Sequence, residues 1–144
     1  TDIIVGFPGE TEEEFKASYN FVKEIGFAQI HVFKYSPRKG TPAAKMSNQI
    51  SPEIKDKRSH QMILLGEEMQ KSFLTKQVGK TLEVLFENLV DNQKDFYEGY
   101  TPNYLKVNAY SKENIENEIL KVKIKEVQND TLIGNIKSSI WIQK

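Results

Sequence analysis

The sequence predicts an α/β segment that a long helix joins to a small all-β barrel. An apolar run that ends in a Gly/Pro-rich turn is followed by an amphipathic helical pattern and a second apolar run. After Gly79 the hydrophobic period changes from about 3.6 residues to 2, which is typical of strands. We therefore divide the chain into an α/β segment (1–50), a connecting helix (51–73) and a β-barrel (74–144).

The α/β segment begins with a β-branched run over 2–5, which predicts a strand that is buried on both faces. Thr11 followed by Glu14 is a capping box that predicts a helix, and Gly26 ends it. A second strand is expected over 28–34. Strand, helix and strand of these lengths form a βαβ unit with a parallel pair. The expected buried stripe of the helix is Phe15, Tyr19, Val22 and Ile25.

A second helix is predicted after an irregular stretch over 36–50. Ser51 is suited to the N-cap and Pro52 to the first helical position. A charged run over 55–58 favours a solvated surface over a binding patch. The expected apolar stripe of this helix is Ile54, Met62, Leu65, Met69 and Phe73.

The last part of the chain predicts five or six short antiparallel strands that close a barrel. Apolar and polar residues alternate over 81–86 and 119–127, and an Asn129-Asp130 turn predicts a hairpin. Trp141 is expected in the core of the barrel. Further strands are expected near 96–100, 104–109 and 139–142.

Composition excludes several classes of function. The formal net charge is zero, so any nucleic-acid binding must come from local clusters of Lys and Arg. There is no Cys, so this chain itself holds no disulfide, zinc finger or iron–sulfur cluster. His31 and His60 have no partner at ligand spacing, and we expect no metal site. No apolar run approaches the roughly 20 residues that cross a bilayer, so we expect no membrane contact.

Two motifs follow the predicted parallel strands. Residues 4–10 (IVGFPGE) and 35–44 (YSPRKGTPAA) each place a Gly/Pro-rich turn at a strand end, where open α/β proteins build ligand sites. The acidic residues after the first turn disfavour a phosphate site, and a simple connecting turn stays open as an alternative. Arg38 is suited to a carboxylate or a phosphate, and a surface ion pair is its alternative role.

The two motifs, in this order, resemble the last part of the TIM-like radical S-adenosylmethionine (SAM) barrel of the tRNA methylthiotransferases. The match covers residues 1–73. The rest resembles the TRAM β-barrel of the same enzymes through Gly79 and the stretches 84–87, 99–104 and 132–134. The resemblance implies a C-terminal fragment of such an enzyme, in which glycine lets the backbone approach the cofactor. The cofactor-binding residues it implies are Gly6, Phe7, Pro8, Gly9, Glu10, Ser36, Pro37 and Arg38.

The resemblance also implies the activity of the parent enzyme. Such enzymes use SAM and two [4Fe–4S] clusters to methylthiolate an adenosine beside the tRNA anticodon. The motifs in both halves resemble those of the branch that acts on N6-threonylcarbamoyladenosine, whereas sister branches act on isopentenyladenosine or a ribosomal protein. Because the Cys ligands would lie outside this chain, we expect it to hold no catalytic residue, to bind no cofactor alone and to be inactive alone. A cytoplasmic location is expected.

The barrel is expected to bind the anticodon stem-loop of tRNA through one basic, aromatic face. The alternative is that alternating Lys residues only keep an exposed strand soluble and block edge pairing. The residues implied in RNA binding are Tyr100, Tyr104, Lys106, Lys121, Lys123 and Lys125.

Two further expectations concern the chain as a whole. A βαβ piece leaves apolar faces and a strand edge uncovered, so we expect self-association through residues 1–50. A non-enzymatic RNA-binding adaptor, in which the first half is only a scaffold, is the alternative to an enzyme.

Overall fold

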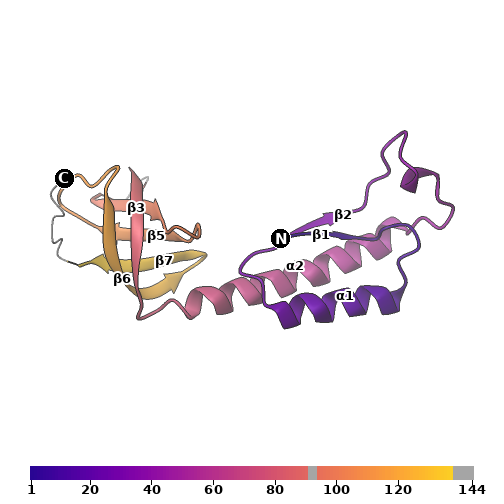
Figure 1. Ribbon diagram of the computed structural model, residues 1–144, viewed down its shortest axis with the longest axis horizontal. Helices are drawn as coiled ribbons and strands as arrows, with labels where there is room; N and C mark the ends of the chain where they lie inside the picture. The colour runs from indigo at the N-terminus through magenta and orange to yellow at the C-terminus, as the bar shows by residue number, and fades with distance from the viewer. Residues whose placement is uncertain (91–93, 138–144) are drawn as a thin grey trace. The chain divides into compact units, whose positions relative to one another are not determined.

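The computed structural model describes residues 1–90 and 94–137, and the chain divides into two compact units, 1–71 and 72–144 (Figure 1). The first unit contains β1 (Asp2–Val5), α1 (Glu12–Ile25), β2 (His31–Lys34), a 3-10 turn (Ala43–Lys45) and most of α2 (Pro52–Thr75). The second contains β3 (Thr81–Leu89), β4 (Phe96–Tyr100), β5 (Lys106–Tyr110), β6 (Ile119–Gln128) and β7 (Thr131–Ile136). No helix within the described residues is long and apolar enough to cross a membrane.

The predicted βαβ unit is confirmed. Strands β1 and β2 pair in parallel, with Ile4 opposite Phe33, and α1 connects them. The second strand begins at His31 rather than at residue 28, because Asp2 is the first residue of β1 that pairs and its partner is His31. The residues before His31 therefore have no ladder partner in β1.

Helix α1 has the predicted termini. The Thr11 side chain accepts a hydrogen bond from the Glu14 N–H at 3.1 Å, and the Glu14 carboxylate accepts one from the Thr11 N–H at 2.8 Å. Gly26 ends the helix in a left-handed conformation, and its N–H donates to the Val22 carbonyl. Ile25 is 51% exposed, so its predicted burial is wrong, because Val22 is the residue of this last turn that enters the core.

Both helices pack on the same face of the two-stranded sheet (Figure 1). The opposite face carries Ile4 and Phe33, which are 57% and 54% exposed. The prediction that β1 is buried on both faces is therefore wrong for this chain, because only one face has a covering layer. The buried core on the covered face consists of Val5, Phe15, Val22, Met62 and Leu65.

Helix α2 begins as predicted at Pro52, and the Ser51 hydroxyl accepts a hydrogen bond from the Ile54 N–H at 3.4 Å. Met62 and Leu65 are buried, but Ile54 is 43% exposed, because its neighbour Lys55 is the residue of the first turn that contacts the strand ends. The helix continues to Thr75 and thus spans the division between the two units.

The second unit is a closed five-stranded barrel with the strand order β3-β4-β5-β7-β6. A small closed barrel is what the sequence predicted, and the Asn129-Asp130 hairpin turn is present between β6 and β7. The expected strand over 139–142 and Trp141 lie outside the described residues. The core of the barrel includes Leu74, Val84, Phe86, Val107, Val122, Ile124 and Leu132.

One pair of strands in the barrel, β5 with β7, is parallel. The expectation of a wholly antiparallel barrel is wrong for a geometric reason. Five strands closed into a ring cannot alternate in direction at every step, so at least one neighbouring pair must run the same way.

Candidate functional site

The turn after β1 is shaped by two glycines with left-handed backbones. Gly6 has φ 72° and Gly9 has φ 87°, conformations that glycine adopts without strain. A Cβ on Gly6 would collide with Cγ of Lys55, and one on Gly9 with the side-chain amide of Asn48. The space that these glycines leave is therefore filled by the chain's own side chains.

Glu10 lies at the end of this turn and is bound within the chain. Its Oε2 accepts a hydrogen bond from the Gly6 N–H at 2.7 Å. The same oxygen forms an ion pair with Arg58 Nη1 at 2.6 Å. The same Nη1 also donates to the Glu10 carbonyl at 3.0 Å. The expectation of a solvated surface over 55–58 is wrong for Arg58, which is 4% exposed, because the turn supplies acceptors for its guanidinium.

An aromatic pair marks the ends of the two parallel strands. The rings of Phe7 and Tyr35 meet edge to face with centroids 5.2 Å apart, and Phe7 is 46% exposed. Lys55 Nζ lies 5.3 Å from the centre of the Tyr35 ring and donates to the Tyr35 carbonyl at 3.0 Å. The Tyr35 hydroxyl oxygen is buried and has no hydrogen-bond partner among the described residues.

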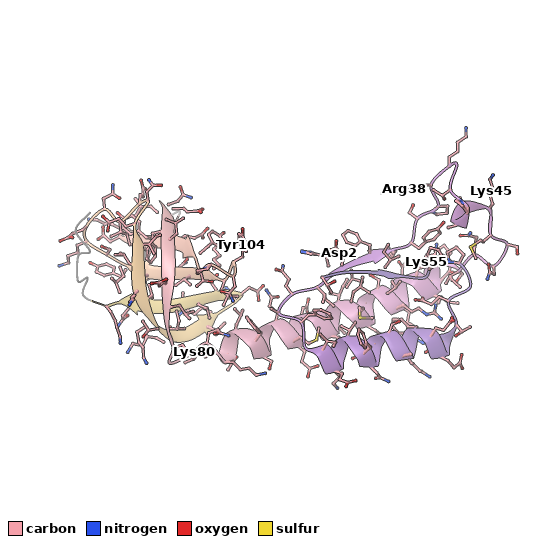
Figure 2. All side chains as sticks on the ribbon, viewed as in Figure 1. Asp2, Arg38, Lys45, Lys55, Lys80 and Tyr104 are labelled. Carbon is pink, nitrogen blue, oxygen red and sulfur yellow. The ribbon has the colours of Figure 1, made fainter. Side chains whose placement is uncertain are left out.

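The remaining predicted cofactor-binding residues follow β2 in the irregular segment. Ser36, Pro37 and Arg38 are exposed, and Figure 2 places the Arg38 side chain beyond the strand ends. The Arg38 carbonyl accepts hydrogen bonds from the N–H and the hydroxyl of Thr41. The structure thus brings the turn over 6–10 together with Tyr35 and Lys55, but leaves Arg38 in a separate turn.

Sequence reasoning did not name Tyr35, Lys55 or Arg58 among the site residues. Tyr35 directly precedes the predicted Ser36-Pro37-Arg38 motif, so its position was a usable signal. Lys55 and Arg58 lie in a charged helical run without any local signal, since their partners are 20 and 48 residues away in the sequence.

The three predicted lysines of β6 have different surroundings. Lys121 and Lys125 are exposed, and Lys121 lies opposite Glu83 of β3. Lys123 is partly buried, and its ammonium donates to the Gly79 carbonyl. Of the three, Lys121 and Lys125 present the more exposed positive charges.

The predicted Tyr100 and Lys106 share a carboxylate on the barrel. Lys106 Nζ lies 2.5 Å from Oε2 of Glu98, and the Tyr100 hydroxyl donates to the other oxygen at 3.3 Å. The hydrogen bond to Glu98 raises the pKa of the Lys106 ammonium above its ordinary value. Lys106 is therefore a paired cation at the surface.

Tyr104 is the most exposed large hydrophobic side chain among the described residues, at 86%, and it has a left-handed backbone with φ 62°. A buried Thr101 organises its loop. The Thr101 carbonyl accepts from the Tyr104 N–H at 2.9 Å, and its hydroxyl accepts from the Leu105 N–H at 2.9 Å. The loop therefore holds an aromatic ring out in solvent.

The strand register places four side chains of the barrel surface in one row across the sheet. Ile119 of β6 pairs with Leu85 of β3, Leu85 with Tyr100 of β4, and Tyr100 with Lys106 of β5. Ile119 and Leu85 are 69% and 40% exposed, and sequence reasoning did not name either of them. The row gives the barrel an apolar and aromatic strip with Lys106 at one end.

Among the described residues there is no group of three or more His, Asp or Glu side chains that would hold a metal ion. The first unit is a βαβ scaffold with a candidate site at its strand ends, and the second is a small closed barrel with an aromatic and basic surface. The class that these features define is an α/β segment followed by a small barrel module. No protein-family model matches the chain.

Curated proteins, however, match most of the chain. The threonylcarbamoyladenosine tRNA methylthiotransferase MtaB of Bacillus subtilis is 43% identical over 126 residues, which are 86% of this chain and 28% of that protein. Two tRNA-2-methylthio-N(6)-dimethylallyladenosine synthases, from Bacillus mycoides and Ehrlichia chaffeensis, are 37% and 39% identical. These matches cover 94% and 93% of the chain, and 27% and 31% of those proteins.

The chain belongs to the tRNA methylthiotransferase family, as the resemblance of its two strand-end motifs and its barrel predicted. It spans only about three-tenths of the length of the curated relatives that it matches.

Proposed function

We propose that this chain is part of a radical SAM tRNA methylthiotransferase, in which the first unit supplies one rim of the cofactor site and the barrel binds tRNA. The observation that carries the proposal is the Gly6–Glu10 turn at the end of a parallel strand, in a chain 43% identical to a tRNA methylthiotransferase. In parallel α/β folds, ligands bind at the carboxyl ends of strands.

The residues at the strand ends fit an adenosyl cofactor in part. The half-exposed Phe7 ring offers an apolar surface to an adenine, and the buried Tyr35 hydroxyl is a polar group still without a partner among the described residues. Arg38 is exposed and suited to a carboxylate. Since the chain has no Cys, it supplies no ligand to an iron–sulfur cluster, and those ligands belong to other residues of the parent enzyme.

SAM bound beside a [4Fe–4S] cluster would supply the radical chemistry, with a second cluster for sulfur transfer. This chain's own part is to bind and orient. Phe7 would pack against the adenine, with Tyr35 against the Phe7 ring and Lys55 against the Tyr35 ring, and the exposed rings of the barrel would hold the RNA. We place the reaction in the cytoplasm, with the modified adenosine beside the anticodon as its substrate.

We assign the N6-threonylcarbamoyladenosine branch, because the relative of that name is 43% identical, against 37% and 39% for the two dimethylallyladenosine synthases. The full-length enzyme should methylthiolate tRNA that carries threonylcarbamoyladenosine. Mass spectrometry of nucleosides from tRNAs that carry either modification tests this assignment. A methylthio group found only on the dimethylallyl nucleoside would overturn it.

The RNA surface of the barrel combines Tyr104, the row from Ile119 to Lys106, and the exposed Lys121 and Lys125. Bases stack on exposed rings, and each such stacking is worth about 1–3 kcal/mol. Lysine side chains neutralise phosphates and make the affinity depend on salt. Single-stranded loops with splayed bases are the form of RNA that suits such a surface.

A salt series with the whole 144-residue chain tests the RNA proposal. The affinity for a tRNA transcript should fall steeply with salt, and the slope should become smaller by about 2 in a Lys121→Ala/Lys125→Ala variant. Tyr104→Ala should weaken binding roughly 5- to 100-fold at every salt concentration, while Tyr104→Phe retains it. Lys112→Ala, at an exposed position after β5, is the matched control. Failure of the chain to bind tRNA at low salt would overturn the proposal.

A further inference from the structure

A buried ion pair closes the turn after β1. Gly6 stands at the start of the turn and Glu10 at its end, and Oε2 of Glu10 accepts the Gly6 N–H at 2.7 Å. The Glu10 N–H in turn donates to the Phe7 carbonyl at 2.9 Å. One carboxylate thus bridges the two ends of the turn, with Phe7 between them.

Arg58 holds this carboxylate from helix α2. Its Nη1 reaches both Oε2 of Glu10 at 2.6 Å and the Glu10 carbonyl at 3.0 Å, so it binds the side chain and the backbone of one residue. The guanidinium also lies 5.4 Å from the centre of the Phe15 ring, and its Nη2 is 3.6 Å from Glu12.

Both side chains of the Arg58–Glu10 ion pair are largely buried. The side chains of Arg58 and Glu10 are 5% and 13% exposed, whereas the nearby Lys34–Asp56 pair is 53% and 63% exposed. Removing one partner of a buried pair leaves an uncompensated charge away from water, which is far more costly than breaking a surface pair. Loss of Arg58 should therefore disturb the turn far more than loss of the surface pair would disturb its surroundings.

We propose that Arg58 is a positioning residue of the cofactor rim: through Glu10 it fixes the Gly6–Glu10 turn and hence the placement of Phe7. This inference rests on the proposed function of the turn. It also changes the role of Glu10, since the oxygen that bridges Gly6 and Arg58 is already occupied by two donors. Glu10 acts on the cofactor through the shape of the turn.

The first test measures the turn in the 144-residue chain by NMR. In Arg58→Met and Arg58→Lys, the Gly6 amide should move upfield and exchange with solvent at least 10-fold faster, since its acceptor is no longer held. Lys57→Met, which removes the same charge from the exposed neighbouring position, should leave the Gly6 amide unchanged. If Arg58→Met prevents folding, Glu10→Gln tests the same contact with little change in volume. An unchanged Gly6 amide in folded Arg58 variants would overturn the inference.

The second test separates positioning from stability in a full-length methylthiotransferase that contains these residues. Arg58→Lys should weaken equilibrium binding of SAM at least 10-fold and raise KM for SAM, without changing KM for tRNA. Equal losses for SAM and tRNA would indicate general damage and overturn the positioning role. If wild-type enzyme binds no SAM while the Gly6 amide still responds to Arg58, the proposed function fails, and so does the positioning of a cofactor, leaving only a structural ion pair.

Discussion

The two units bury their sheets in different ways. The barrel closes its five strands into a ring, and its interior side chains, such as Phe86 and Val122, have no exposed surface. The βαβ unit has only two strands, one face of which is covered by helices while the other leaves Ile4 and Phe33 half exposed. Closure pairs every strand with two neighbours, whereas the small parallel sheet has two free edges and a bare face.

The difference indicates where each unit obtains its stability. Within the described residues the barrel has a buried core of its own, and we predict that it folds as an independent unit, although a domain of this size is only marginally stable. The βαβ unit leaves Ile4 and Phe33 exposed on one face of its sheet, and we predict that a second copy of the chain covers this face. Four changes, from the largest expected effect to the smallest, test this comparison.

Phe86→Ala should produce the largest effect, because it removes a fully buried ring from the barrel core. Loss of a large aromatic from a core costs about 3–5 kcal/mol, which is most of the stability of a small domain. Hydrogen exchange should become fast in β4 and β6 while the amides of α1 stay protected. Leu89→Ala, at a position that is 49% exposed, is the control. Simultaneous loss of protection in α1 would show that the two units do not fold independently.

An Ile4→Lys/Phe33→Lys variant should weaken self-association of the chain. These two side chains pair across the bare face of the sheet, and burying each contributes about 1.5–3 kcal/mol to a dimer. The dissociation constant from sedimentation equilibrium should rise at least about 10-fold. Tyr110→Lys, at a half-exposed position of the barrel, should leave it unchanged. A wild-type chain that remains monomeric over the whole concentration range contradicts this prediction.

Thr11→Ala should destabilise the βαβ unit by about 1 kcal/mol, because the capping hydroxyl of α1 is lost. Hydrogen exchange of the α1 amides measures the change, and the barrel amides should not respond. Ser18→Ala, an exposed position in the middle of α1, is the matched control and should be neutral or slightly stabilising. An equal change in both units would argue against their independence.

The ion pair of Lys106 with Glu98 should have the smallest effect, and only at alkaline pH. Because the pKa of Lys106 is raised in the folded chain, the stability it contributes is complete below the unfolded pKa and is lost as the pH rises through the folded pKa. Since Lys106 is 40% exposed, the loss should be at most about 0.5 kcal/mol. Urea unfolding above pH 10 should show a shallower decline for Lys106→Met than for Lys112→Met. Identical declines would contradict the pairing.

Sequence reasoning succeeded where the determinants are local. The Thr11 capping box, the Gly26 cap, the Ser51-Pro52 helix start and the Asn129-Asp130 turn depend on neighbouring residues, and all are present. The exposure of Ile4 could not be predicted, because burial of a strand depends on which layers cover it. For the candidate site, the turn and its glycines were recognisable, but the buried contact of Arg58 with Glu10 joins residues 48 apart and has no local pattern.

The parallel pairing of β5 with β7 has a consequence for the order of folding. Because β7 fills the space between β5 and β6, the four earlier strands can form only an open sheet with β5 and β6 as its edges until β7 is added. In such an open sheet β6 is an edge strand that has only β3 as a neighbour, and it carries Lys121, Lys123 and Lys125. Charged lysines on such an edge discourage pairing with other nascent chains. Two of these side chains, Lys121 and Lys125, are those that we propose for RNA binding, and they would also protect the barrel from aggregation before it closes.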